Sequence, residues 1–201
     1  MTSGDRVGQL SRDTAETQIS IELNIDGAGD YQLHVPNGMF EHLLAQLSRH
    51  GLIDLTVSAD GDTEVGLHHL VEDVGIVLGR ALADAVGEGA GIRRAAHTFM
   101  PLDETLAFTA VDFGGRGYSV IDAEIGDSDM GGLSGDLIRH FLESLAREGR
   151  FNLHVRIVSG VNNHHKAEAI FKSLARSLRT ALELDPRHAG QVPSTKGTIS
   201  S

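Results

Sequence analysis

The segment His164-His165-Lys166-Ala167-Glu168 decides how the chain is organised, because its pattern also occurs earlier as His68-His69-Leu70-Val71-Glu72. In a helix, residues three and four apart are neighbours, so each glutamate can approach either histidine of its own segment. The two adjacent imidazoles point about 100° apart around the helix axis and cannot easily bind the same ion. Each segment therefore offers ligands to two metals, and two such segments predict two sites of mixed ligands.

A regular order of expected strands and helices surrounds each segment. After a polar leader over residues 1–9, the first half is expected to contain strands over 19–25 and 31–35, a helix over 37–51, a strand over 53–57 and a helix over 67–86. The second half is expected to contain strands over 106–110 and 118–122, a helix over 137–145, a strand over 153–157 and a helix over 161–184. Both halves therefore repeat one β-β-α-β-α order.

Two further histidines fix the register of this repeat. His42 lies 26 residues before His68, and His140 lies 24 residues before His164. Glycines at 87–91 follow a helix, which favours a helix end and linker over a phosphate-binding loop. We therefore predict an α+β fold, a tandem duplication of two-layer α/β units in which helices cover each sheet. The expected parts are a first half over 1–90, a second half over 91–188 and a C-terminal tail over 189–201.

Composition excludes several classes of protein. The chain has no cysteine, so disulfides, thiolate metal sites and cysteine nucleophiles are absent. A formal net charge of −11 argues against binding to a nucleic-acid backbone. The N-terminal residues lack the apolar region of a signal peptide, and no apolar run approaches the ~20 residues of a membrane span. We expect a soluble cytoplasmic protein that binds neither membrane nor nucleic acid.

The repeated pattern supplies a set of candidate metal ligands. Imidazole and carboxylate groups without sulfur suit Mn²⁺, Fe²⁺, Co²⁺ or Zn²⁺, with positions left for water or substrate. Of the histidines outside the repeat, His97 is expected in a loop and His154 on a strand, and both are interpreted as structural. The eight candidate ligands are His42, His68, His69, Glu72, His140, His164, His165 and Glu168.

Several other residues fit either a functional or a structural role. Arg94 and Arg116 lie in expected turns, where they either clamp an anion or remain solvated charges. Lys172 follows a candidate glutamate by four residues, so a plain helix ion pair is the alternative to a substrate contact. The tail segment Ser194-Thr195-Lys196 has residue types that bind phosphate, but it also fits an ordinary polar tail.

Taken in order, the residues resemble the imidazoleglycerol-phosphate dehydratases of histidine biosynthesis, from Arg12 to Gly197. Seven positions depart from the family pattern, none of them a candidate ligand: Ala15, Glu41, Gly66, Leu67, Ala95, Ala96 and Gly114. The resemblance is carried by Arg12-Asp13-Thr14-Ala15-Glu16-Thr17, residues 42–51, residues 68–73, Gly91-Ile92-Arg93-Arg94, Pro101-Leu102-Asp103-Glu104, residues 111–116, the second His-His-x-x-Glu with Phe171-Lys172, and Pro193-Ser194-Thr195-Lys196-Gly197.

The resemblance implies metal-dependent dehydration of imidazoleglycerol phosphate to imidazole acetol phosphate. It implies two Mn²⁺ ions per active site, bound by the eight candidates, although other divalent metals remain open. It further implies a homo-oligomer, a 24-mer built from trimers with active sites between subunits. The residues implied to contact the small phosphorylated imidazole substrate, mostly at its phosphate, are Glu16, Arg94, Arg116, Lys172, Ser194, Thr195 and Lys196.

The implied chemistry needs a proton-transfer group beside the metals. Glu16 is the expected group, with Glu72 or Glu168 as alternatives that combine metal binding with a base role. Two other functions would use the same ligands. One is a dinuclear metal hydrolase of phosphoesters, with a water bridging two close metals; the other is a non-catalytic shell protein assembled by structural metals. Adjacent histidines that point apart favour well-separated metals and argue against the hydrolase.

Overall fold

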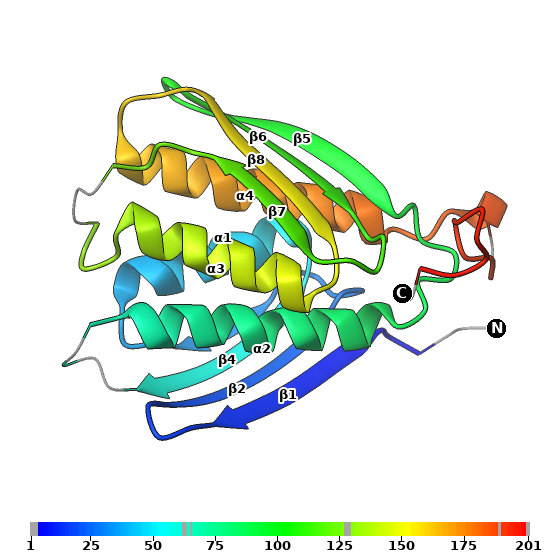
Figure 1. Cartoon of the computed structure of the whole chain (residues 1–201), viewed down its shortest axis with the longest axis horizontal. Coiled ribbons are helices and arrows are strands. Elements are labelled where there is room, and N and C mark those ends of the chain that lie inside the picture. The colour runs from blue at the N-terminus through cyan, green and yellow to red at the C-terminus, as the bar shows by residue number, and fades with distance from the viewer. Residues whose placement is uncertain (1–3, 62–63, 65, 127–129, 189, 200–201) are drawn as a thin grey trace.

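The computed structural model describes residues 4–61, 64, 66–126, 130–188 and 190–199. These residues form two four-stranded sheets and four α-helices, arranged as two halves of like order (Figure 1). Residues 1–3 of the expected leader and residues 189, 200 and 201 of the expected tail lie outside the described residues. The duplicated α+β architecture predicted from the sequence is confirmed.

Both halves contain the same elements in the same order. The first half contains β1 (Val7–Asp13), β2 (Thr17–Asn24), β3 (Tyr31–His34), α1 (Gly38–Gly51), β4 (Asp54–Gly61) and α2 (His68–Val86). The second half contains β5 (Ala95–Leu102), β6 (Thr105–Asp112), β7 (Tyr118–Asp122), α3 (Gly135–Glu148), β8 (Asn152–Ser159) and α4 (Asn163–Leu182), followed by a 3₁₀ turn, Pro186–His188. The strand orders are β1-β2-β4-β3 and β5-β6-β8-β7, with only the last pair of each sheet parallel.

Each half begins with a strand that the sequence patterns do not predict. Strand β1 begins within the expected polar leader, and β5 contains His97, which the sequence places in a loop. The inward positions of β1 are Gly8, Leu10 and Arg12, so the apolar alternation of a half-buried strand is missing. In β5 the outward face carries Phe99, and the inward face includes Thr98, so the alternation of apolar and polar residues is again lost. The repeated unit is therefore β-β-β-α-β-α.

The helices lie between the two sheets, and helices from opposite halves pack on one another (Figure 1). Helix α1 contacts α4, and α2 contacts α3. The Phe141 ring centroid lies 5.4 Å from that of Phe40 and 5.4 Å from that of Phe171, so three helices from both halves share one aromatic centre. One hydrophobic core therefore spans both halves of the duplication.

Side-chain caps determine where three of the four helices begin. Asn37, Ser134 and Asn162 each accept a backbone N–H from the first turn of α1, α3 and α4. In α4 the cap binds the N–H groups of His164 and His165 at 2.9 and 3.2 Å. The second His-His pair is therefore fixed in the first turn of its helix. The first pair opens α2 without a side-chain cap.

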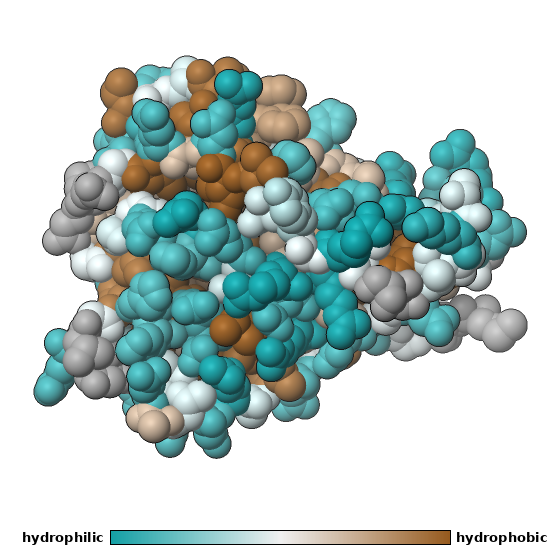
Figure 2. All heavy atoms as spheres, viewed as in Figure 1, coloured by the Kyte–Doolittle hydropathy of each residue, from teal (hydrophilic) through white to brown (hydrophobic). Residues whose placement is uncertain are grey.

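The outer surface is mostly polar, with apolar side chains gathered toward the second sheet at the top of the view in Figure 2. Phe99, Tyr118, Val120 and Val158 are large exposed apolar residues of that sheet. Among the helices in the described ranges, none is both long enough and apolar enough to cross a membrane.

Two glycines allow α2 and α3 to approach closely. A Cβ atom on Gly75 would lie 2.9 Å from the Phe141 carbonyl oxygen, and one on Gly79 would lie 2.8 Å from the Leu145 carbonyl oxygen. Both distances are shorter than a carbon–oxygen van der Waals contact, and the obstructing atoms belong to the backbone. Residues with side chains at these positions would force the two halves apart.

Replacing Gly79 by alanine should therefore destabilise the protein, although alanine is normally the better helix former by about 1 kcal/mol. We expect Gly79→Ala to lower the free energy of unfolding by about 1–3 kcal/mol through overpacking, measured by denaturant unfolding. Gly38→Ala is the matched control, because nothing lies within 4 Å of a Cβ there. Equal or higher stability of Gly79→Ala would contradict the close-packing argument.

Candidate active site

The first histidine cluster joins α1 to α4. His42 Nε2 lies 3.0 Å from Glu168 Oε1, and His164 Nε2 lies 3.8 Å from Glu168 Oε2. The two imidazole rings are stacked, with centroids 5.9 Å apart. One ligand atom from each of the three residues lies within 4.8 Å of the other two, and this donor set fits a divalent cation. A cavity of about 670 Å³ opens beside both histidines.

The second cluster joins α2 to α3 in the same way. The ring centroids of His68 and His140 are 4.8 Å apart, and His68 Nε2 lies 3.6 Å from Glu72 Oε2. Other charged groups also approach these residues. Asp136 Oδ2 lies 3.3 Å from His140 Nε2, and Arg147 Nη2 lies 3.9 Å from Glu72 Oε1. Each cluster thus combines one histidine from a shorter helix with a histidine and a glutamate from a longer helix of the other half.

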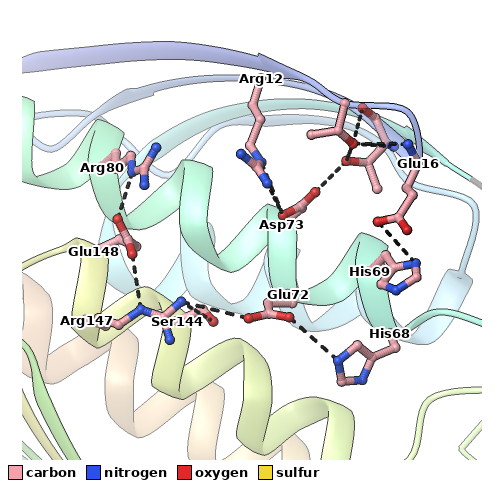
Figure 3. A network of polar contacts seen from close by, with 12 residues as sticks. Arg12, Glu16, His68, His69, Glu72, Asp73, Arg80, Ser144, Arg147 and Glu148 are labelled. Atoms are coloured by element: carbon pink, nitrogen blue, oxygen red, sulfur yellow. Dashed lines mark hydrogen bonds and ion pairs between the residues drawn. The ribbon is translucent and has the colours of Figure 1, made fainter.

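The second histidine of each motif points away from its cluster. The two adjacent rings of the first motif have centroids 5.9 Å apart at 85°, and those of the second motif are 6.3 Å apart at 78°. His69 Nδ1 lies 3.6 Å from Glu16 Oε2 (Figure 3), and His165 Nδ1 lies 2.8 Å from Glu104 Oε2. The divergence expected from helix geometry is present in both copies. Six of the eight candidate ligands lie in the two clusters, whereas His69 and His165 lie outside them.

A polar network holds the turn that carries Glu16 against α2 (Figure 3). Thr14 Oγ1 accepts the N–H groups of Glu16 and Thr17 at 3.1 and 2.9 Å. The Thr17 hydroxyl donates to Asp73 Oδ2 at 2.5 Å, and Arg12 Nε donates to Asp73 Oδ1 at 3.2 Å. Because Asp73 belongs to α2, the network fixes the position of the Glu16 backbone relative to the helix of the second cluster.

The sequence patterns did not identify Asp73 or Arg12 as site residues. Asp73 lies on the core-facing side of α2, beside the buried residues Leu70 and Val74 in the chain. An ionisable residue within the apolar stripe of a helix is rarely buried without a partner, and this signal was available in the sequence. Its charged partner, Arg12, lies on β1, a strand that the patterns did not predict.

Glu104 is the counterpart of Glu16 in the second half, and it was also missed as a site residue. Its Oε1 atom accepts the N–H groups of Val161 and Asn162 at 3.2 and 2.9 Å. The Asn162 amide and the His165 ring together hold the pKa of Glu104 well below its usual range. The same contact raises the pKa of His165. The repeated Glu-Thr pair at 16–17 and 104–105 was the available signal.

Lys172 lies at the first cluster and forms the predicted helix ion pair. Its Nζ atom is 3.2 Å from Glu168 Oε1, and the two side chains are 17% and 13% exposed. Burial opposes ionisation of Glu168, but the hydrogen bond with His42 and the Lys172 ammonium outweigh it. They hold the pKa of Glu168 below its usual range. A charged carboxylate is therefore available at this cluster.

The predicted phosphate-binding residue Arg94 lies at the other end of the helices from the histidine clusters. Its backbone N–H donates to the Ala181 carbonyl at 2.8 Å, and Ala181 follows His164 by seventeen residues on α4. This spacing corresponds to about 26 Å along the helix axis. The Arg94 side chain donates to the Pro193 carbonyl at 2.9 Å and to Asp112 Oδ1 at 2.7 Å, which places the tail beside it.

Apart from Lys172, which lies at the first cluster, the remaining predicted phosphate ligands share this end of the molecule (Figure 1). Arg116 is exposed in the turn before β7, two residues after Gly114, where a Cβ would lie 3.4 Å from Arg94 Nη2. Residues 194–196 directly follow Pro193, and the Ser194 hydroxyl accepts the Lys196 N–H at 3.2 Å. Within the described part of a single chain, Arg94, Arg116 and residues 194–196 are therefore not brought to the histidine clusters.

Comparisons with known proteins agree over nearly the whole chain. The family model described as imidazoleglycerol-phosphate dehydratase matches residues 36–178. An imidazoleglycerol-phosphate dehydratase from Dehalococcoides mccartyi is 50% identical over 196 residues, covering 98% of each chain. One from Dinoroseobacter shibae is 49% identical over 194 residues, covering 96% of this chain and all of the relative.

Solved structures give the same result. The crystal structure of imidazoleglycerol-phosphate dehydratase from Staphylococcus aureus superposes with a TM-score of 0.81 at 30% identity, covering 89% of this chain and 99% of the other. The Pyrococcus furiosus enzyme, solved in complex with (S)-C348, superposes with a TM-score of 0.80 at 32% identity, covering 94% and 99%. The chain therefore belongs to the imidazoleglycerol-phosphate dehydratase family, the hydro-lyases that carry out this dehydration in histidine biosynthesis.

Proposed function

We propose that this chain dehydrates D-erythro-imidazoleglycerol phosphate to imidazole acetol phosphate with two divalent metals, Mn²⁺ being the expected ion. The observation that carries the proposal is the convergence of His42, His164 and Glu168 from opposite halves of the fold. The pseudo-equivalent cluster of His68, Glu72 and His140 supplies the second set of donors. Nitrogen and carboxylate donors without sulfur suit Mn²⁺.

The proposed metals and acidic residues have separate roles. When bound, Mn²⁺ supplies Lewis acidity toward the imidazole ring and hydroxyl group of the substrate. Glu16 transfers the proton, because its side chain is 57% exposed and its backbone is anchored to α2 through the Thr14 and Thr17 network. Glu72 and Glu168 serve as metal ligands, and Glu168 is held ionised by its neighbours.

Arg94, Arg116, Lys172 and residues 194–196 are proposed to bind the substrate phosphate. Their cationic and hydroxyl groups match a phosphate chemically, and remote binding energy of this kind orients the reacting carbons. Arg94 and the tail lie about 26 Å from the histidine clusters of the same chain. A small substrate cannot span that distance. The complete site is therefore proposed to form between subunits of a homo-oligomer, expected to be a 24-mer of trimers.

The outer face of the second sheet is the proposed contact between copies. Phe99 and Phe108 are directly opposite one another on β5 and β6, with ring centroids 4.8 Å apart, and Phe99 is 57% exposed. The equivalent positions of the first sheet are Ser11 and Ser20, whose hydroxyls are hydrogen-bonded at 3.0 Å. Because the two sheets are equivalent parts of the duplication, phenylalanine in place of serine at these two positions supports the proposal that another copy covers the second face.

Removing the metal should abolish turnover reversibly. We expect exhaustive chelation to eliminate formation of the ketone product from imidazoleglycerol phosphate, and added Mn²⁺ to restore it, because the donor sets need an ion to act. Re-addition of Mg²⁺, which prefers oxygen ligands, is the matched control and should restore much less activity. Undiminished turnover after complete metal removal would contradict the proposed metal role.

Glu16→Gln should remove the proton-transfer group while leaving the rest of the site in place. We expect kcat for the dehydration to fall by about 10²–10⁴-fold, the usual contribution of a general acid or base. Mn²⁺ binding and subunit assembly should be unchanged. Glu22→Gln, an exposed glutamate on the outer face of β2, is the control and should retain activity. Near-normal turnover of Glu16→Gln would show that another residue transfers the proton.

The double variant Phe99→Ser, Phe108→Ser should weaken assembly, because it gives the second sheet the residues of the first. We expect size-exclusion chromatography with light scattering to show a smaller species, with circular dichroism unchanged. Ser20→Ala on the first sheet should assemble normally. A double variant that keeps the wild-type mass would rule out this face as a necessary contact.

A further inference from the structure

Glu16 and Glu104 occupy equivalent positions in the two halves but have different surroundings. Each directly precedes the threonine that opens the second strand of its sheet. Each also faces Nδ1 of the second histidine in a His-His-x-x-Glu motif, at 3.6 Å for His69 and 2.8 Å for His165. The duplication thus placed one carboxylate beside one imidazole twice.

The Glu104 carboxylate is fully engaged. Oε1 accepts three hydrogen bonds, from the N–H groups of Val161 and Asn162 and from the Thr105 hydroxyl at 3.1 Å. Oε2 lies at hydrogen-bond distance from His165 Nδ1. Since the donors come from the strand and from the start of α4, both the position and the orientation of the carboxylate are fixed.

The Glu16 carboxylate is not held in this way. Within the described part of the chain, no backbone amide binds it, and its 3.6 Å separation from His69 Nδ1 exceeds a hydrogen bond. The threonine at the equivalent position, Thr17, directs its hydroxyl to Asp73 instead. The position equivalent to Asp73 on α4 is Ala169, so this alternative acceptor is absent from the second half. The side chain of Glu16 is therefore anchored only through its backbone.

We propose that Glu104 is a positioning residue that fixes the tautomer and orientation of His165 for metal binding. This inference rests on the proposed function, because it assigns a metal to His165. An ionised carboxylate can only accept hydrogen bonds, so His165 Nδ1, at 2.8 Å, is the donor. In the neutral imidazole, which is the form that binds a metal, the lone pair then resides on Nε2. The nearest acidic atom to Nε2 is Asp103 Oδ2 at 3.8 Å, beyond hydrogen-bond distance. The His165 side chain is 28% exposed, so Nε2 is the ring atom left to bind a metal that a second subunit completes.

The arrangement matches a recurring feature of metal sites, in which a ligating histidine donates its other ring N–H to a carboxylate. The two equivalent glutamates would then have different roles. Glu104 is engaged and orients a ligand, whereas the Glu16 carboxylate is 57% exposed and lies beyond hydrogen-bond distance from His69, so it remains available to exchange a proton with substrate. The same duplicated position therefore serves metal geometry in one half and chemistry in the other.

The matched substitutions Glu104→Gln and Glu16→Gln test this division. In Glu104→Gln the single amide oxygen is expected to take the three donors that bind Oε1, which turns the NH₂ group toward His165 Nδ1. Nδ1 must then accept, so the proton moves to Nε2 and blocks coordination. We expect the affinity for Mn²⁺ at one of two sites to fall by about 10–100-fold, measured through the electron paramagnetic resonance signal of free Mn²⁺. Glu16→Gln should bind Mn²⁺ at both sites like the wild type.

A double-mutant cycle separates positioning from a general structural effect. Glu104 also binds the start of α4, so its substitution could loosen that helix. If Glu104 acts through His165, Glu104→Gln should weaken Mn²⁺ binding in the wild-type background and have no further effect in His165→Ala. Histidine ¹⁵N resonances of the metal-free protein, recorded at a pH high enough for the imidazole to be neutral, should in addition show the Nδ1–H tautomer of His165 in the wild type and its loss in Glu104→Gln.

Three results of the Mn²⁺-binding experiments would contradict the positioning role of Glu104. Unchanged affinity of Glu104→Gln at both sites, with a wild type that binds two Mn²⁺, would overturn the positioning role and leave the proposed function standing. If Glu104→Gln lowered the Mn²⁺ affinity by the same factor in the His165→Ala background as in the wild type, Glu104 would have a purely structural role. A wild type that binds no Mn²⁺ would overturn the proposed metal function and this inference together.

Discussion

The packing of helices from opposite halves is the constraint on which the rest of the structure depends. Neither half can bury its helices alone, because α1 rests on α4 and α2 rests on α3. Phe141 joins the aromatic side chains of both halves, and Gly75 and Gly79 let two helix backbones approach. The same crossing builds both histidine clusters, since each needs one histidine from each half. Stability and the geometry of both histidine clusters are therefore properties of one interface, and a change that separates the halves would lose both.

Duplication supplied two copies of each part, and the copies have since taken different roles. Thr17 donates to Asp73, whereas its counterpart Thr105 donates to Glu104. Glu168 has a lysine four residues later on its helix, whereas the equivalent position after Glu72 is an isoleucine. The cation beside each glutamate therefore has a different origin: Lys172 lies on the same helix as Glu168, whereas Arg147 approaches Glu72 from α3 at 3.9 Å.

Local patterns in the sequence were sufficient for the duplication, the four helices and the six histidines and glutamates that the structure brings together in two clusters. They work where one face of an element is apolar and the other is polar, as in β2 and α2. They failed for β1, whose inward residues include Gly8 and Arg12, and for β5, whose outward face carries Phe99. The roles of Asp73 and Glu104 depend on partners 56 to 61 residues away, and no local pattern contains that information.

Subunit assembly, in the proposed function, is a part of the catalytic apparatus. The imidazole and phosphate of the substrate are separated by only a few bonds, whereas the histidine clusters and Arg94 of one chain are about 26 Å apart. Both ends of one chain can therefore act, but on different substrate molecules. His165 lies outside the histidine cluster of its own chain. In the proposed function its Nε2 atom would therefore bind a metal that is shared with another subunit. A single subunit would hold every required residue and still lack a complete site.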